Sequence, residues 1–551
     1  MDAERLAGVL ARGLATGGVR AVFGLPGGGN NLEVVGAVHS IGLPFVLAHS
    51  ETAATIMAAV HADLTGAPSA VVVTRGPGAA SAVNGAAQAL LDRQAIIVLT
   101  DSVAARDRSR ITHQYVDQRA MFRPVTKATA DLGGHEPEQV ITDALALAAR
   151  HPRGPVHLDF DPSSTEAAQL ARDESSDQVT EDTLHAACDL LRAAHHPVVV
   201  LGLGARDVVT PVRDLLNGSH VPVLTTYRAK GVIPDHWANC AGLLTGATVE
   251  SAVLARADVI LAIGLDSVEL IPAPWVYPAP VVSISSWVDP SDYLPRAVDL
   301  VGDLDQLVAG LSGSLDSEWP AGSGKQFRQA GIALLVEEAE PAAGISPQRL
   351  IRRVRALAPA GTIATVDAGA HMLAVLPLWE TEDRDEMIVS SGLATMGFAL
   401  PAAIAAALAR PNRRIVCFVG DGGLGMVLAE LETLGRLNLP VSVVVFNDSR
   451  LSLIAVKQVS ERHGGESAVA YCDIAFDRLA DGFGISSHTV STADGLDEAI
   501  SASLTAIGPS LLDVRVDPSY YPGVLDAIRG ERHRVTSDWR TAATVPSQGV
   551  A

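Results

Sequence analysis

The sequence predicts an α/β protein built from three consecutive doubly wound parallel-sheet domains. The chain has 551 residues, which is too long for a single hydrophobic core and suits three domains of ordinary size. Short apolar strands alternate with helical stretches along most of the chain, as in parallel sheets that helices cover on both faces. Two stretches rich in polar or small residues interrupt this alternation and mark domain boundaries.

The first domain is expected over residues 1–165. Its strands are predicted in four apolar runs: RAVFGLP (20–26), PFVLAHS (44–50), SAVVVTRG (69–76) and QAIIVLTD (94–101). Stretches of helical composition, such as TAATIMAAVHADLTG (52–66), separate them. The polar, acidic stretch STEAAQLARDESSDQVTED (164–182) then indicates a linker.

The same alternation predicts a central domain over residues 183–335 and a third domain over residues 345–525. The central strands are expected in HPVVVLGLG, VPVLTTY, ADVILAIG and APVVSISS, and the Gly/Ser-rich run AGLSGSLDSEWPAGSGKQ ends that domain. The third set is expected in GTIATVDAG, RRIVCFVGDGG, PVSVVVFND and SLLDVRVDP. Residues 526–551 lack apolar periodicity and are expected to form a C-terminal tail. The first and third domains share size and rhythm, as the products of a duplication would.

Composition narrows the class of protein. With 48% hydrophobic and 19% charged residues the chain is expected to be globular. A formal net charge of -21 argues against a nucleic-acid partner, because phosphates would be repelled over most of the surface. The four cysteines are far apart and lack the spacing of a zinc site or disulfide framework, so a cytoplasmic location is expected. No run reaches the roughly 18 apolar residues that span a bilayer, so no membrane partner is expected.

The most informative stretch is FVGDGGLGMVLAELETLGRLNLPVSVVVFNDSRLS, residues 418–452. One apolar strand ends at Gly420-Asp421-Gly422-Gly423, a helix follows, and a second strand ends at Asn447-Asp448. Because parallel strands end at the same edge of a sheet, Asp421 and Asp448 are expected to face one point. Carboxylates suit Mg²⁺, and glycines at a helix N-terminus let a diphosphate approach the backbone. Taken alone, the glycine run also fits a plain strand-to-helix turn that an aspartate caps.

Gly420-Asp421-Gly422, followed 27 positions after Asp421 by Asp448, resembles the cofactor motif of thiamine-diphosphate enzymes. Upstream, SSGLATMGFALPAAIAAALARP (390–411) resembles the segment before this motif in acetolactate synthases and their relatives. The resemblance covers residues 1 to about 525 and implies pyrimidine-binding, central and diphosphate-binding domains in that order. It also implies thiamine diphosphate and Mg²⁺ as cofactors, the ion being held by Asp421, Asp448 and the main-chain carbonyl of Arg450. The family usually has Asn where this chain has Asp448, a change that keeps an oxygen ligand and adds a negative charge.

The resemblance assigns further residues to the cofactor. In HSETAA, Glu51 matches the glutamate that protonates the aminopyrimidine ring, although an acid in a first helical turn also fits a role at the helix dipole. Met396 matches the bulky side chain that supports the folded cofactor, with a gap-filling core methionine as the alternative. Ala370 and His371 lie where the family contacts the diphosphate, and His371 also fits an ordinary loop histidine.

Three positions bear on the substrate. RITHQYVDQRAMFRPVTK (110–127) resembles the active-site loop of the family, in which Gln114 matches a glutamine that faces the substrate. His113 stands where acetolactate synthases typically have Phe, and the His-Gln pair resembles the carboxyethylarginine synthase branch; an exposed loop histidine is the alternative. Lys457 stands where those enzymes carry a substrate-selecting Trp. Polar residues here predict a wetter pocket and an acceptor other than 2-oxobutyrate.

The central domain is expected to be mainly architectural. VVVLGLGARD contains Gly202 and Gly204 but lacks the third glycine of a dinucleotide fingerprint. Biosynthetic acetolactate synthases bind FAD in this domain through motifs that resemble GMHG and GARFDDR. The corresponding stretches here read AGLLTG (241–246) and AIGLDSVEL (262–270), without the arginines and the histidine. We therefore expect no FAD.

The resemblance implies a thiamine-diphosphate-dependent transferase or lyase that decarboxylates a 2-oxo acid and passes the acyl-anion unit to an acceptor, as acetolactate synthases do. Alternatives within this class are a simple 2-oxo acid decarboxylase, a benzaldehyde-lyase-like carboligase and a carboxyethylarginine-synthase-like enzyme. From other classes, a non-catalytic cofactor-binding paralogue and a Rossmann oxidoreductase are the alternatives, and the presence of Glu51 with Asp421 and Asp448 argues against the paralogue. Because the family binds its cofactor between subunits, a homodimer or homotetramer is expected.

Overall fold

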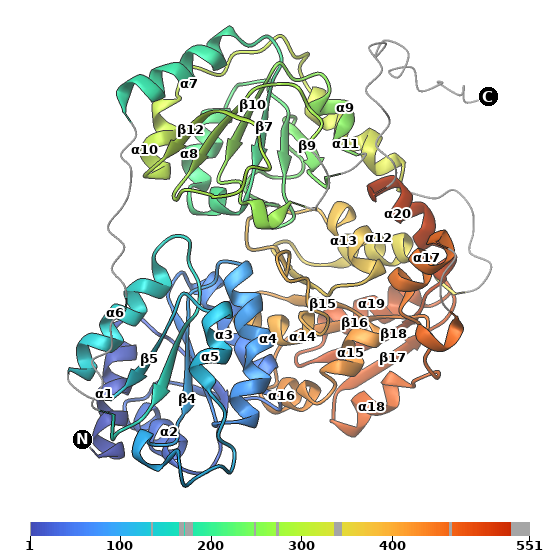
Figure 1. The fold of residues 1–551 in the computed structure, drawn as a ribbon. Coiled ribbons are helices and arrows are strands. Elements are labelled where there is room, and N and C mark those ends of the chain that lie inside the picture. Colours follow the sequence, from blue (N-terminus) through green and yellow to red (C-terminus); the bar gives the residue numbers. More distant parts are fainter. Residues whose placement is uncertain are drawn as a thin grey trace. The chain divides into compact units, whose positions relative to one another are not determined.

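The computed structural model describes residues 2–133, 136–164, 170, 180–246, 249–270, 275–335, 344–461 and 465–529. These residues form three six-stranded sheets in which all strand pairings are parallel, and helices flank each sheet (Figure 1). The predicted fold class is therefore confirmed. By contact, the described parts of residues 1–177 and 338–521 make one compact unit, and those of residues 178–337 and 522–551 make a second.

The first sheet has the strand order β2-β1-β3-β4-β6-β5. Its strands are β1 (Val22–Leu25), β2 (Phe45–Leu47), β3 (Ser69–Val73), β4 (Ile96–Asp101), β5 (Ala128–Leu132) and β6 (Val156–Phe160). Its helices are α1 (Ala3–Thr16), α2 (Asn30–Ser40), α3 (Glu51–Thr65), α4 (Pro77–Leu91), α5 (Gln118–Phe122) and α6 (Pro137–Ala149). Alternate strand residues pack against α1, α2 and α6 on one face and against α3, α4 and α5 on the other. Valine and isoleucine predominate in the inner strands because both faces are buried.

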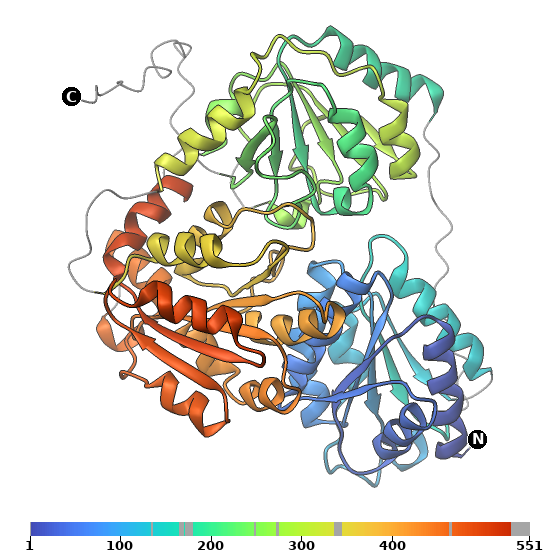
Figure 2. The same cartoon turned by 180° about the vertical axis from the view of Figure 1, so that it is seen from behind.

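The third sheet has the order β14-β13-β15-β16-β18-β17, which repeats the order of the first sheet. Its strands are β13 (Ile363–Val366), β14 (Met387–Val389), β15 (Ile415–Gly420), β16 (Val441–Asn447), β17 (Ser486–Val490) and β18 (Ser510–Arg515). Its helices are α12 (Pro347–Leu357), α13 (Ala370–Leu378), α14 (Ala399–Ala409), α15 (Asp421–Met426), α16 (Glu430–Arg436), α17 (Ser452–Glu461), α18 (Phe476–Gly482) and α19 (Leu496–Thr505). Figure 2 gives the view of this sheet from behind.

One hydrophobic core joins the first and third domains within the first unit. Helices α3 and α14 pack against each other in it, and both are rich in buried alanine, whose short side chains let helix backbones approach closely. Hydrogen bonds also connect the two domains. The Asp92 carboxylate, for example, accepts the N–H groups of Ser391 and Gly392 at 3.1 and 2.8 Å. The first and third domains therefore form one packed body.

The central sheet has a different order, β12-β11-β10-β7-β8-β9. Its strands are β7 (Pro197–Leu201), β8 (Val223–Thr225), β9 (Cys240–Leu243), β10 (Val259–Ile263), β11 (Val281–Ser285) and β12 (Arg296–Val301). The helices of this unit are α7 (Glu181–Ala193), α8 (Val209–Leu216), α9 (Ser251–Leu254), α10 (Leu304–Gly310) and α11 (Ser323–Ala333). The last described helix of the chain is α20 (Tyr521–Arg529), and the carbonyl of its Ile528 accepts a hydrogen bond from the buried hydroxyl of Thr245.

The structure differs from the sequence prediction at the chain's connections and end. Helix α20 runs to Arg529, so residues 526–529 are helical rather than part of a tail, and residues 530–551 lie outside the described residues. Most of the predicted linker, residues 165–169 and 171–179, also lies outside them. Among the helices of the described chain, none is both long and apolar enough to cross a membrane.

Candidate active site

The ends of two neighbouring strands bring Asp421 and Asp448 together. Strands β15 and β16 pair in parallel, Asp421 opens α15, and Asp448 directly follows the last residue of β16. The Asp421 carboxylate accepts the N–H of Gly422 at 2.6 Å and that of Arg450 at 3.1 Å. Asp421 thereby ties the start of its own helix to the loop that follows Asp448.

Both carboxyl groups of this corner have perturbed acidity. Burial raises the pKa of Asp421. Burial also raises the pKa of Asp448 to about 7, and the negative charge of Asp421 adds to the rise. A hydrogen bond from the Ser452 hydroxyl opposes it. Two ionised acids in one buried corner repel each other, so a divalent cation between them would stabilise the ionised pair. This donor set fits Mg²⁺, which prefers oxygen ligands and often shares its shell with phosphate.

The glycine run beside Asp421 lies against other side chains. A Cβ at Gly423 would overlap the carboxylate of Asp367, and one at Gly422 would come within 3.2 Å of the Tyr471 ring. The helix expected after Gly423 instead starts within the run, at Asp421, and ends at Met426. A separate helix, α16, then starts at Glu430. Glycine is required at position 423 because the backbone lies directly on a buried acid.

That buried acid, Asp367, links three segments of the site and is not predicted by the sequence analysis. It is fully buried at the end of β13, and it accepts the N–H groups of Ala368 at 2.8 Å, Gly397 at 3.1 Å and Phe398 at 3.3 Å. Burial raises the pKa of Asp367 to about 7, while the three donors oppose the rise. Asp367 thus joins the strand end to the glycine run and to the turn that carries the half-buried Met396. An acid directly after a buried strand, in TVDAG, is the signal that would have indicated it.

We predict that Asp367→Asn destabilises the site. Asparagine keeps the oxygen that accepts from Ala368 and Phe398, but its amide nitrogen would face the N–H of Gly397, donor against donor. The buried mismatch should cost about 1–3 kcal/mol in the free energy of unfolding. A lower thermal unfolding midpoint, measured without added ligand, tests this. An unchanged midpoint would contradict the role of the carboxylate.

His371 lies in the first turn of α13 rather than in a loop, directly after Ala370. Its ring is buried, stacks on Phe446 with centroids 5.1 Å apart, and lies close to the backbone of Gly420. Burial lowers the pKa of His371 to about 4, so the ring is neutral at pH 7. Its Nε2 atom is buried and has no hydrogen-bond partner in the described structure. A polar ligand group at this corner would satisfy that atom.

Glu51 is the first residue of α3 and is half-buried. The preceding Ser50 caps the helix, its hydroxyl accepting the N–H of Ala53 at 3.1 Å. The Glu51 carboxylate lies near Gly78 of α4, since a Cβ added there would be 3.1 Å from its Oε1 atom. Within the described residues, no hydrogen bond or ion pair joins Glu51 to Asp421 or Asp448 of the same chain.

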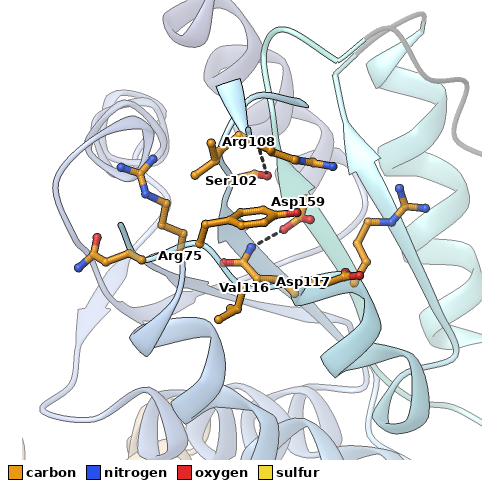
Figure 3. A pocket seen from close by; sticks show the side chains of 11 residues that line it. Arg75, Ser102, Arg108, Val116, Asp117 and Asp159 are labelled. Atoms are coloured by element: carbon orange, nitrogen blue, oxygen red, sulfur yellow. Dashed lines mark hydrogen bonds between the residues drawn. The ribbon is translucent and has the colours of Figure 1, made fainter. Parts of the chain in front are cut away.

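Residues 112–117 of the predicted active-site loop are exposed, and residues 114–117 border a hollow in the first domain (Figure 3), whereas the loop's later part contains the helix α5. His113 and Gln114 are both exposed, but only Gln114 is among the residues that line the hollow. Gln114 has a positive φ of 58°, and its carbonyl lies directly against Gly76, where a Cβ would not fit. Figure 3 shows the Arg75 and Arg108 side chains directed to opposite sides, so these cations do not converge on one point.

A buried polar network that the sequence analysis does not predict anchors this loop. The Gln118 side chain donates to Asp159 at 2.7 Å and to the carbonyl of Asp101 at 3.0 Å, and it accepts the N–H of Gly76 at 2.8 Å. Burial raises the pKa of Asp159 to about 6, although hydrogen bonds from Thr100 and Gln118 oppose the rise. Gln118 therefore fixes the end of the loop to the floor of the hollow.

Three domain profiles of one protein family match the chain in order. The N-terminal TPP binding domain of thiamine pyrophosphate enzymes matches residues 4–121, the central domain matches residues 184–311, and the C-terminal TPP binding domain matches residues 367–514. The chain belongs to the thiamine pyrophosphate enzyme family. The third match contains the Asp421 corner, and the first contains Glu51 and Gln114.

Curated acetolactate synthases resemble the chain over most of its length. The acetolactate synthase of Bacillus subtilis (strain 168) is 28% identical over 524 residues, which cover 91% of this chain and 91% of that protein. The large subunit of acetolactate synthase isozyme 1 from Escherichia coli (strain K12) is 29% identical over 543 residues, covering 91% and 92%. A probable acetolactate synthase large subunit of Methanocaldococcus jannaschii is 25% identical over 556 residues, covering 93% and 91%.

In the central domain, the backbone N–H groups of the Gly202–Gly204 turn already donate hydrogen bonds to other groups of the protein. The N–H of Gly202 donates to the Ile263 carbonyl at 2.9 Å, and that of Gly204 donates to the Gly264 carbonyl at 2.8 Å. The N–H of Leu203 donates to the Glu269 carboxylate at 2.7 Å. A dinucleotide phosphate would need these donors and would meet a carboxylate. This turn therefore does not fit a dinucleotide.

We predict that Glu269 makes the stability of the central domain fall with rising pH. Burial raises the pKa of Glu269 to about 7, although hydrogen bonds from Thr226 and Leu203 oppose the rise. Below about pH 4.5 Glu269 is protonated in both the folded and the unfolded state. Between about pH 4.5 and 7 it ionises freely only in the unfolded state, so the free energy of unfolding falls by on the order of 3 kcal/mol. Glu269→Gln can satisfy the same partners and should remove this fall.

The measurement is the difference in unfolding temperature between Glu269→Gln and wild type, taken at pH 5 and at pH 8. We expect the unfolding temperature of Glu269→Gln to increase relative to that of wild type as the pH rises. Glu318→Gln is the control, because that glutamate is an exposed carboxylate of the same domain. An equal difference at both pH values would show that ionisation of Glu269 does not destabilise the central domain.

Proposed function

We propose that this chain is a thiamine-diphosphate-dependent, acetolactate-synthase-like enzyme that decarboxylates a 2-oxo acid and transfers the acyl-anion unit to an acceptor. The observation that carries the proposal is the buried corner of Asp421 and Asp448 beside a glycine run, within the domain that matches the C-terminal TPP binding domain. The full-length similarity to acetolactate synthases supports the reaction class.

The residues of the third domain fit the diphosphate and its ion. Asp421, Asp448 and the main-chain carbonyl of Arg450 would hold Mg²⁺, since all three supply oxygen. The backbone of Gly420, Gly422 and Gly423 would lie along the diphosphate, with Ala370 and His371 beside it. The repulsion between the two acids favours a bound cation at this corner, and the buried Nε2 atom of His371 could pair with a polar group of the ligand.

Residues outside this corner would act on the rest of the cofactor and on the substrate. When bound, thiamine diphosphate supplies the carbon nucleophile that attacks the carbonyl of the 2-oxo acid. Glu51 would hold a proton on its carboxyl group and donate it to the aminopyrimidine ring. Met396 would support the folded shape of the cofactor. Gln114 and His113 would contact the substrate from the exposed loop, with Lys457, exposed on α17, near the acceptor.

A complete site needs more than one copy of the chain in this proposal. Because the family binds its cofactor between subunits, a second subunit would bring its Asp421 corner to Glu51 of the first, in a homodimer or homotetramer. The occupied amides of the Gly202–Gly204 turn support the absence of FAD. The four separated, unpaired cysteines support a reducing cytoplasm.

A carboxyethylarginine-synthase-like reaction is the second candidate, and His113 with Gln114 favours it.

The experiment is a product screen. The purified protein, loaded with thiamine diphosphate and Mg²⁺, is incubated with pyruvate and other 2-oxo acids, with and without polar acceptors, and the products are identified by mass spectrometry. We expect a carboligation product that disappears when thiamine diphosphate is omitted, and an absorption spectrum without flavin bands. No turnover of any 2-oxo acid would favour the non-catalytic paralogue. Flavin bands together with efficient acetohydroxybutyrate formation would indicate an ordinary biosynthetic enzyme instead.

A further inference from the structure

A side chain of the third domain holds the segment that leads into the helix of Glu51. One oxygen of Glu430, Oε1, accepts the N–H of His49 at 2.9 Å and the N–H of Ser50 at 3.1 Å. These two residues connect β2 to α3, and Ser50 is the cap of α3. Glu430 is the first residue of α16, which follows the short helix opened by Asp421.

The position of Glu430 is itself fixed. Its side chain is buried, with 1% of its surface exposed, and its second oxygen accepts a hydrogen bond from the Thr433 hydroxyl at 2.8 Å. Six residues further along α16, Arg436 donates to the carbonyl of Leu47 at 2.7 Å, at the end of β2. The main chain on both sides of the β2–α3 connection is therefore held by α16.

We propose that Glu430 is a positioning residue for Glu51, acting through the amide groups of His49 and Ser50. The proposal rests on the proposed function, in which the Glu51 carboxyl meets the aminopyrimidine ring. Ser50 is covalently bonded to Glu51, so a shift of its amide moves the first turn of α3 and the carboxyl with it. A displacement of about 1 Å at a reacting group can cost about 10²-fold in rate.

The geometry requires a side chain at position 430 that is long enough for its oxygen to reach both N–H groups, and it does not require a negative charge there. Glu430→Gln keeps an oxygen at the same distance for both N–H groups, and its amide nitrogen can donate to the Thr433 hydroxyl. Glu430→Asp keeps the charge but withdraws the carboxylate by one methylene. Glu432→Ala is the matched control, because Glu432 lies on the same helix, is more than one-third exposed, and pairs with the side chains of His49 and Arg436 rather than with the main chain of residues 49 and 50.

The test compares these variants as full-length protein loaded with thiamine diphosphate and Mg²⁺. Exchange of the cofactor C2 hydrogen is followed by NMR after acid quench, and affinity for thiamine diphosphate is measured by calorimetry. We expect Glu430→Asp to slow exchange about 10–100-fold with affinity within about threefold of wild type. Glu430→Gln and Glu432→Ala should exchange within about threefold of wild type.

The outcomes separate this proposal from the proposed function. Wild-type exchange in Glu430→Asp would overturn the positioning role, and so would slow exchange in Glu430→Gln with normal exchange in Glu430→Asp, because charge would then matter rather than reach. Parallel loss of exchange and affinity in Glu430→Asp would also overturn it. Glu51→Gln is measured alongside: if that variant exchanges as fast as wild type, the acid role that the proposed function gives to Glu51 fails, whatever the Glu430 variants show.

Discussion

Replacing Asp421 with alanine should abolish Mg²⁺-dependent binding of thiamine diphosphate. A methyl group cannot replace a carboxylate oxygen in the octahedral shell of Mg²⁺. The substitution also removes the acceptor of the Gly422 and Arg450 N–H groups, so the loop after β16 loses its link to the start of α15. Calorimetric titration of the protein with thiamine diphosphate, with and without Mg²⁺, measures the effect.

Asp448→Asn is the control for this prediction. It restores the residue that the family usually has, keeps an oxygen ligand, and leaves an acceptor for the Ser452 hydroxyl. It also removes one of the two acids that repel each other in the buried corner. We expect Mg²⁺-dependent binding to persist in this variant. Equal affinity in Asp421→Ala and wild type would refute the metal site.

Glu51→Gln should remove catalysis while leaving thiamine diphosphate affinity within about tenfold of wild type. Glutamine has the same size, so it fits beside Gly78, but it has no carboxyl proton to donate. Loss of a general acid of this kind typically costs about 10²–10⁴-fold in rate. The measurement is NMR-detected exchange of the cofactor C2 hydrogen, together with product formation from pyruvate.

The control for Glu51→Gln tests the alternative role at the helix dipole. Glu33 is also an acid in the first turn of a helix of the first domain, α2, so Glu33→Gln removes a comparable charge from a different helix. It should leave exchange unchanged. If Glu51→Gln exchanges as fast as wild type, Glu51 serves only its helix.

The sequence predicts the fold well where strands are buried on both faces and less well elsewhere. Four strands in each sheet coincide with predicted apolar runs, whereas β5, β6, β9, β12, β14 and β17 are not predicted. Five of these six are at sheet edges, where strands are short or exposed, as in SSHTV of β17. The sixth, β6, is central and fully buried, but His157 and Asp159 interrupt its apolar pattern. Those polar residues are tolerated because Thr100 and Gln118 hydrogen-bond them.

The residues of the candidate site also differ in how far the sequence predicts them, depending on whether their partners are near or distant in sequence. Asp421 and Asp448 are predictable, because adjacency of two parallel strands follows from the chain between them. Glu430 is not, and for Asp367 the sequence can indicate the acid but not its partners, since both residues bind main-chain amides distant in sequence, Gly397 and His49 among them. A backbone N–H leaves no trace in the sequence. Only the folded structure reveals such partners.

The repeated strand order has a consequence for the history of the chain. Helix α3 follows the second strand of the first sheet, and α14 follows the second strand of the third, so the two helices are equivalent, and they pack against each other. Contact between equivalent surfaces is what a two-fold axis between identical partners produces. The body formed by the first and third domains therefore has the arrangement of an ancestral homodimer whose subunits became fused, with the central domain inserted between them. The two halves now differ at their sites: the first has an acid, Glu51, at the start of its helix, and the third has the paired Asp421 and Asp448.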